Sequence, residues 1–369
     1  MSQVAQSFQP SLNSSSVPAS SSSALHPWVR NPLWDLCGLG GGLGVLSVGV
    51  FVLYLMDERL WGQSYSATAT VIYSFLFGFP HLAATYCRVY LDRREVRAYW
   101  QVAFHVPVVI FTIVLALVLF LPETAPLLYS VWFHWQWWHI ARQQFGVVRV
   151  YQRSQRTSRP EIDRRIDLAA MFMVPIWGLA SRSNQWWEAS RVGKPSPFLD
   201  GPIWMIPIPH LVVWLAAVLS GVSLVVFLGR QVQLIRSREF SLPKCLMILS
   251  GMATFAVAMV LIRDFNWGYL ALSLWHSVQY IFFVWHYQNR KYRSTIDPEA
   301  RLASYLAQPR NLWAYLLFLM MITALVAGVL CETLKSLGLT PWLFTLVLTL
   351  NLHHYWIDSV VWKTRKAAA

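Results

Sequence analysis

The sequence predicts an all-α protein, a polytopic bundle of about ten transmembrane helices with both termini in the cytoplasm. Three observations predict this fold class: the composition is apolar, the apolar residues form long stretches, and the cations gather in alternate connections. Hydrophobic residues make up 56% of the 369 residues and charged residues only 13%, about half the share in an average soluble domain. These figures exclude a disordered chain, a small disulfide scaffold and an ordinary soluble enzyme.

The expected elements follow in chain order. Residues 1–27 are Ser-rich and nearly uncharged, so we expect a disordered cytoplasmic tail and no signal peptide. Residues 28–369 are expected to form a single transmembrane helical domain. A bilayer core of about 30 Å requires about 20 apolar residues in a helix. Ten stretches satisfy this length, at 34–56, 66–88, 99–121, 125–147, 165–181, 206–228, 243–262, 266–289, 312–333 and 340–362.

The positive charges predict the orientation of these spans. With the N-terminus inside, 24 of the 30 Lys and Arg residues fall in cytoplasmic segments, as the positive-inside rule requires. The outside segments hold only Arg59, Arg182, Arg191, Lys194, Arg263 and Lys335. Topology therefore explains the net charge of +13, and no nucleic-acid partner is expected. The predicted location is an integral, multi-pass membrane protein, in the inner membrane if the source is bacterial.

The histidines are concentrated at one depth of the expected bundle. His26 lies in the tail and His210 at the outer end of a span, whereas the other eight fall in the cytoplasmic half or near the midplane. Ionisable side chains inside a membrane are costly, so such a layer indicates a function. The eight residues are His81, His105, His134, His139, His276, His286, His353 and His354.

Helical spacing pairs several of these histidines with an orienting group. His139 is four residues before Gln143, and His354 is four before Asp358, so each pair shares a helix face. A carboxylate or an amide on the same helix face can hydrogen-bond to the histidine and orient it for binding a metal. The candidate ligands are His81, His134, His139, His276, His286, His353, His354 and Asp358, with Gln143, Gln279 and His105 as orienting or supplementary groups.

Imidazole-rich sites suit iron, copper or zinc, whereas magnesium and calcium prefer oxygen ligands. The main alternative without metal is a polar network between helices, because a histidine in a membrane commonly hydrogen-bonds to a neighbouring helix. Adjacent His353 and His354 cannot point the same way, so one of the two can be structural. Iron, as one or two ions with dioxygen as co-substrate, is the cofactor that we expect.

Two segments resemble known membrane oxygenases. The spacing His134-x4-His139 and the pair His353–His354 resemble the fatty-acid desaturases and hydroxylases, whose histidines bind two irons; no HxxHH box occurs here. GFPHLAATY at 78–86 is similar to the Gly-x-Pro-His-Gly-Ala segment of the Brp/Blh type of β-carotene oxygenase, with Leu82 in place of a Gly. That resemblance implies that His81 is an iron ligand, and both resemblances imply a lipid-soluble substrate.

The expected function is therefore a His-ligated non-haem iron oxygenase or desaturase-like enzyme acting on a lipid, fatty acyl or carotenoid substrate. A cytoplasmic electron donor is a possible partner. Two alternatives from other classes stay open: a b-type haem protein, in which histidine pairs ligate the haem, and a transporter with a histidine relay.

Overall fold

The computed structural model describes residues 28–57, 65–155, 157–191, 205–293 and 295–362. Every regular element within these ranges is helical, and they contain no strand, which confirms the all-α class. The expected tail at 1–27 lies outside the described residues.

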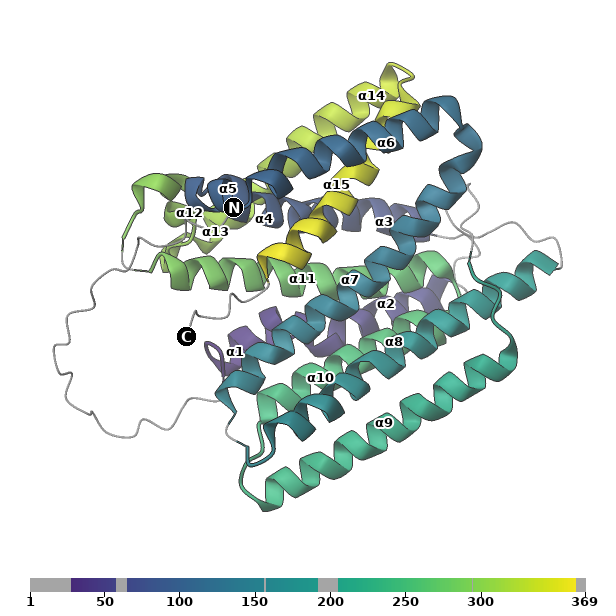
Figure 1. The fold of residues 1–369 in the computed structure, drawn as a ribbon, viewed down its shortest axis with the longest axis vertical. Coiled ribbons are helices and arrows are strands. Elements are labelled where there is room, and N and C mark those ends of the chain that lie inside the picture. Colours follow the sequence, from purple (N-terminus) through teal and green to yellow (C-terminus); the bar gives the residue numbers. More distant parts are fainter. Residues whose placement is uncertain (1–27, 58–64, 156, 192–204, 294, 363–369) are drawn as a thin grey trace, which may run out of the picture.

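The helices form a bundle in which several long elements run side by side (Figure 1). The first part of the chain contains α1 (Pro32–Trp34), η1 (Asp35–Leu39), η2 (Gly41–Gly44), α2 (Val45–Met56), α3 (Ser66–Tyr73), η4 (Ser74–Gly78), α4 (Phe79–Tyr90), α5 (Arg93–Ala98), η5 (Gln101–His105), α6 (Val106–Phe120), η6 (Pro122–Thr124) and α7 (Ala125–Ser154). The second part contains α8 (Pro160–Arg191), α9 (His210–Arg236), α10 (Leu242–Ala256), η7 (Val257–Leu261), α11 (Phe265–Lys291), η8 (Pro298–Ala300), α12 (Arg301–Leu306), η9 (Pro309–Asn311), α13 (Leu312–Thr323), η10 (Ala324–Cys331), α14 (Glu332–Ser336) and α15 (Thr340–Val361).

Within the described residues, four helical segments are long and apolar enough to cross a membrane. They coincide with four of the expected spans, and the chain therefore has the helices of a membrane protein. The segments are Gln101–Phe120, His210–Arg236, Leu242–Leu261 and Pro309–Ser336. Helix α9 lies along one edge of the bundle (Figure 1). It exposes large apolar side chains such as Leu211, Trp214 and Val218. An apolar surface of this kind suits contact with lipid.

Helix α11 occupies the middle of the bundle, where it packs against α2, α3, α4 and η7 (Figure 1). It is buried on nearly all sides, and Trp275 and Trp285 are among the largest fully buried side chains. A helix in this position presents its polar residues to other helices instead of to lipid or water. The polar residues of α11 therefore meet those of its neighbours inside the protein.

A glycine run breaks the first expected span, 34–56, into α1, η1, η2 and α2. Gly41 has a φ of +55°, and a Cβ there would lie 2.7 Å from Trp275. The indole Nε1 of Trp275 donates a 3.0 Å hydrogen bond to the carbonyl of Gly40. The glycines therefore permit close packing of this segment against α11.

Helix α8 continues ten residues beyond the expected end of its span at 181. Arg182 is buried there, and its guanidinium donates to the carbonyls of Ala258 at 2.7 Å and Arg263 at 2.6 Å, and also to that of Ile262. These carbonyls lie at the end of η7, where they lack helical partners. The cation is therefore held inside the protein, and the expected outside loop at 182–205 begins as helix.

Candidate metal centre

Four histidines from four different helices meet inside the bundle. His81 lies on α4, His139 on α7, His276 on α11 and His354 on α15. Their ring centroids are separated by 4.6 Å for His81–His354, 4.7 Å for His81–His276, 4.8 Å for His139–His354 and 5.3 Å for His139–His276. None of the four residues is more than 7% exposed. We refer to these four residues together with Asp358 as the histidine cluster.

The nitrogen positions in the histidine cluster are compatible with a metal ion. One ligand atom each from His81, His139 and His354 lies within 4.8 Å of the others. The Nε2 atoms of His81 and His354 are 2.9 Å apart, and without a metal this contact is a hydrogen bond between the two rings. With imidazole nitrogens about 2.1 Å from a metal, this separation corresponds to an angle of about 90° at the ion. The pair therefore suits two adjacent positions of an octahedral site.

Asp358 directs one carboxylate oxygen toward the same place. Its Oδ2 lies 3.9 Å from the Nε2 atoms of both His139 and His354. Its other oxygen, Oδ1, accepts a 2.6 Å hydrogen bond from the hydroxyl of Tyr280. The carboxylate is thus fixed through Oδ1, while Oδ2 faces the imidazoles.

A chain of hydrogen bonds sets the tautomer of His354. An ionised carboxylate only accepts, so Tyr280 donates to Asp358 and accepts from Thr85, whose Oγ1 is 2.6 Å away. Thr85 in turn accepts from Nδ1 of His354 at 2.8 Å. This assignment leaves a lone pair on Nε2 of His354, the atom that faces the cluster. Histidines that bind metals are held in the same way through their other nitrogen.

Several atoms of the histidine cluster have no hydrogen-bond partner among the described residues. They are Nδ1 of His81, Nε2 of His139, both ring nitrogens of His276 and Oδ2 of Asp358. Buried polar atoms are nearly always paired, because an unpaired one costs free energy. The described residues therefore leave five polar atoms of this cluster without a hydrogen-bond partner.

Two of the predicted ligands face away from the cluster and bond to backbone carbonyls. His134 is half-buried, and its Nδ1 donates to Ser130 one turn earlier at 2.7 Å. His353 uses Nε2 to donate to the carbonyl of Val102 at 2.8 Å. Both side chains are thus engaged with structural partners, and the structure does not bring them to the other histidines.

Two further histidines also lie elsewhere. His286 is buried ten residues after His276, which is about 15 Å along α11, and it has no hydrogen-bond partner in the described part of the chain. His105 is exposed and packs its ring against Trp100. Neither residue contributes to the histidine cluster.

The two predicted glutamines differ in their surroundings. Gln143 lies one turn after His139, and both polar atoms of its amide are buried without a partner in the described chain. Gln279 donates a 2.6 Å hydrogen bond to the carbonyl of Leu39, so its amide nitrogen is used by η1. The amide of Gln143 lies beside the ring of His139, in a position to orient it, and Oε1 of Gln279 is also buried without a partner in the described chain.

Tyr280 is a residue of the site that was not predicted from the sequence. It lies four residues after His276 on α11, which places both on one helix face. It connects Thr85 to Asp358 and receives a 3.4 Å hydrogen bond from the indole of Trp362. Its spacing from His276 is the signal that could have identified it.

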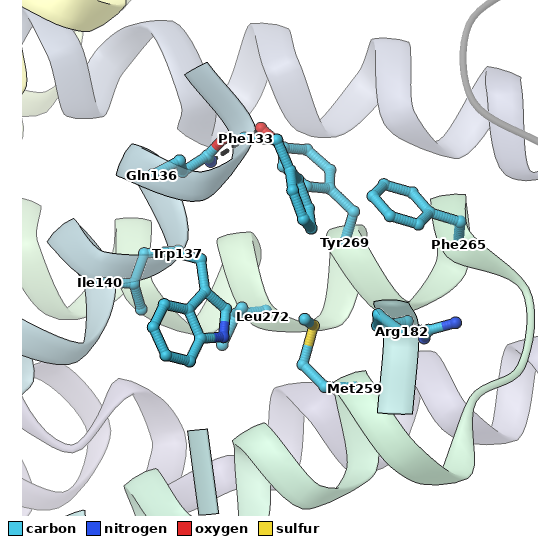
Figure 2. A pocket seen from close by; sticks show the side chains of 9 residues that line it. All are labelled: Phe133, Gln136, Trp137, Ile140, Arg182, Met259, Phe265, Tyr269 and Leu272. Carbon is cyan, nitrogen blue, oxygen red and sulfur yellow. Dashed lines mark hydrogen bonds between the residues drawn. The ribbon is translucent and has the colours of Figure 1, made fainter. Parts of the chain in front are cut away.

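A small cavity lies between α7, α8, η7 and α11 (Figure 2). Its volume is about 10 Å³, enough for roughly one water molecule, and most of its lining is apolar. Gln136, three residues before His139, donates to the hydroxyl of Tyr269 at its wall (Figure 2). Tyr269 is seven residues before His276, so the cavity adjoins the helix faces that carry the histidines.

Comparisons of the chain with protein-family models, curated proteins and solved structures find no match. The function is therefore inferred from the residues of the chain and their geometry.

Proposed function

We propose that the protein is a multi-pass membrane enzyme, a non-haem iron oxidoreductase that acts with dioxygen on a hydrophobic substrate. The ion would be held by His81, His139, His276, His354 and Asp358. The single observation that supports this most strongly is the group of His81, His139 and His354, whose ligand atoms lie within 4.8 Å of one another, with the ring of His276 and Oδ2 of Asp358 beside them.

The chemistry of the donors favours iron. Four imidazoles and one carboxylate make a site without thiolate, and this donor set suits iron better than magnesium or calcium. Copper and zinc also accept imidazole, so the metal has to be identified by measurement. Because the ligand atoms of His81, His139 and His354 lie within 4.8 Å of one another, one ion fits better than two. Iron supplies the activation of dioxygen, and the chain supplies the ligands and their orientation.

The position of the cluster inside the bundle supports a lipophilic substrate. We propose that all ten expected spans cross the bilayer, including the six that are less apolar, four of which carry the histidines of the cluster. The cytoplasmic end would carry the excess of Lys and Arg and give access to an electron donor. A site surrounded by helices excludes bulk water, which protects reactive oxygen chemistry from side reactions.

Neither alternative function has a specific observation in its favour. A b-type haem would have to lie between two axial imidazoles. The four rings instead contact one another directly, with centroids as close as 4.6 Å. A transporter with a histidine relay would require polar groups that continue to both faces of the membrane. The cavity that adjoins these helix faces is mostly apolar.

The test is a metal analysis with an absorption spectrum of the detergent-purified protein. The proposal predicts about one iron per chain and no Soret band. Retention of that iron would then justify screening lipids and carotenoids for oxygen-dependent turnover. A Soret band would move the protein to the haem class. Failure to retain iron, copper or zinc after reconstitution would leave a polar network and overturn the proposal.

A further inference from the structure

Arg88 is a buried cation on the same face of α4 as the histidine cluster. His81, Thr85 and Arg88 are spaced by four and three residues, so all three lie on one side of the helix. Arg88 follows His81 by seven residues, which is about 10 Å along the axis. Only 5% of Arg88 is exposed. It therefore lies inside the protein, about two turns from the cluster, toward the expected cytoplasmic end.

The guanidinium of Arg88 is incompletely paired by the protein. Its Nη2 donates a 3.3 Å hydrogen bond to the carbonyl of Val361, and its Cζ lies 3.4 Å from the ring centroid of Trp362 and 4.6 Å from that of Tyr287. Its Nε and Nη1 atoms are buried and have no hydrogen-bond partner among the described residues. No carboxylate among the described residues forms an ion pair with Arg88.

The nearest acidic group of the site does not fill this role. Oδ1 of Asp358 already accepts from Tyr280, and Oδ2 faces His139 and His354. Trp362 contacts both sides, since it lies against Arg88 and donates to Tyr280. The free nitrogens of Arg88 are thus separated from the cluster by an indole and a phenol.

A buried charge without a directly paired counter-ion is expensive. One carbonyl, two aromatic rings and the more distant charge of Asp358 compensate it only in part. An anion from outside the chain would complete the pairing. Guanidinium groups bind carboxylates through short, charge-assisted hydrogen bonds. Arg88 presents a single guanidinium, which matches one monovalent carboxylate better than a doubly charged phosphate.

We propose that Arg88 binds the carboxylate of an amphipathic, long-chain substrate whose apolar chain extends to the histidine cluster. This inference rests on the proposed function, because it names the substrate class of that same site. The separation of about 10 Å between Arg88 and His81 along α4 requires a chain of roughly eight or more carbons between the carboxylate and the reacting position. Short carboxylates would reach Arg88 but not the metal.

The experiment measures binding of radiolabelled palmitate to the full-length protein in phosphatidylcholine nanodiscs, with metal content determined in every sample. Hexadecanol and acetate serve as competitors that lack the charge and the chain, respectively. Arg88→Gln should weaken palmitate binding about 10–100-fold, the loss expected for one charge-assisted contact. Arg88→Lys should retain part of the affinity because it keeps the charge. Arg142→Gln, which removes an exposed cation, is the matched control and should bind as the wild type does.

Competition in the wild type keeps the test decisive if Arg88→Gln fails to fold. Palmitate should displace the label at a concentration at least tenfold below that of hexadecanol or acetate. Equal competition by hexadecanol, or unchanged palmitate affinity in folded Arg88→Gln, would overturn the proposal. If no sample retains metal while palmitate binding still depends on Arg88, the carboxylate site stands and the metal function fails. If the samples retain metal but show no preference for palmitate, the metal function stands and the carboxylate site fails.

Discussion

Two buried polar clusters in this protein are similar in burial but differ in how completely they are paired. In the first, Lys244 is 0% and Asp167 1% exposed, and their side chains form a 3.0 Å ion pair. Gln152 adds a 2.6 Å hydrogen bond to the same carboxylate oxygen. The histidine cluster is also almost completely buried, yet five of its ligand-type atoms have no partner in the described chain.

The difference shows which buried polar groups indicate function. The Lys244–Asp167 pair is completed by the protein and joins α10 to α8, as a structural contact does. In the histidine cluster, Nε2 of His139, both ring nitrogens of His276 and Oδ2 of Asp358 have no partner in the described chain, and an ion could bind one nitrogen of each ring together with the carboxylate oxygen. Burial of polar residues is therefore weak evidence for a site, whereas unpaired ligand atoms gathered at one point are stronger evidence.

The largest effect should come from removing a ligand of the histidine cluster. His139→Ala should abolish most metal retention, a greater loss than the roughly 10–100-fold typical of residues that only orient a ligand. Metal content per folded chain, measured by mass spectrometry after dialysis, checks this expectation. His210→Ala removes an exposed histidine far from the cluster and should change nothing. Equal metal content in the two variants would contradict the assignment.

Lys244→Met should lower the stability of the fold and leave metal binding unchanged, the reverse of the effects expected for His139→Ala. It leaves Asp167 buried without its partner, which should lower the free energy of unfolding by about 3–5 kcal/mol. Metal per folded chain should not change. Unfolding in mixed micelles measures the first quantity and metal analysis the second. The double variant Lys244→Met/Asp167→Leu removes both charges and should recover much of the loss; a single variant as stable as the wild type would refute the contrast.

Tyr280→Phe should weaken metal binding about 10–100-fold, because Asp358 loses the hydrogen bond that fixes its carboxylate. Competition with a chelator measures the change in affinity. Tyr315→Phe is the matched control, since Tyr315 is also buried but its hydroxyl has no partner in the described residues. The orienting role of Tyr280 is wrong if both variants hold metal equally well.

The smallest effect is expected at Asp92, outside the spans. Burial alone would raise the pKa of Asp92, but hydrogen bonds from Lys291, Tyr292 and the N–H of Arg94 lower it from 3.8 to about 2. A lowered pKa means that the charged form stabilises the fold above pH 4 and that this stabilisation is lost toward pH 2.

Asp92→Asn should therefore cost about 1–2 kcal/mol at pH 7, and its difference from the wild type should shrink as the pH falls from 4 to 2. Unfolding in detergent at several pH values tests this trend. Arg97→Gln, at an exposed ion pair with Glu299, should have almost no effect. A difference for Asp92→Asn that stays constant with pH would show that its charge does not matter.

The sequence predicts the helical class and part of the site, and the limits are physical. Spacing of four residues places His354 and Asp358 on one face, and both belong to the cluster. Both His134 and His139 are predicted as ligands from the sequence, although five residues turn a helix by about 500° and so separate the two by about 140°. The four helices α4, α7, α11 and α15 meet through packing between distant segments. Residue spacing within one helix does not predict such contacts.

X-ray absorption at the metal edge of the purified protein tests the metal site most directly, because it reports the atoms bound to the ion. We expect a shell of nitrogen and oxygen at about 2.0–2.2 Å, with the scattering of several imidazole rings and no sulfur. The imidazole contribution should fall in His139→Ala and stay unchanged in His210→Ala. A shell without imidazole, or one with sulfur, would contradict metal binding by the histidine cluster.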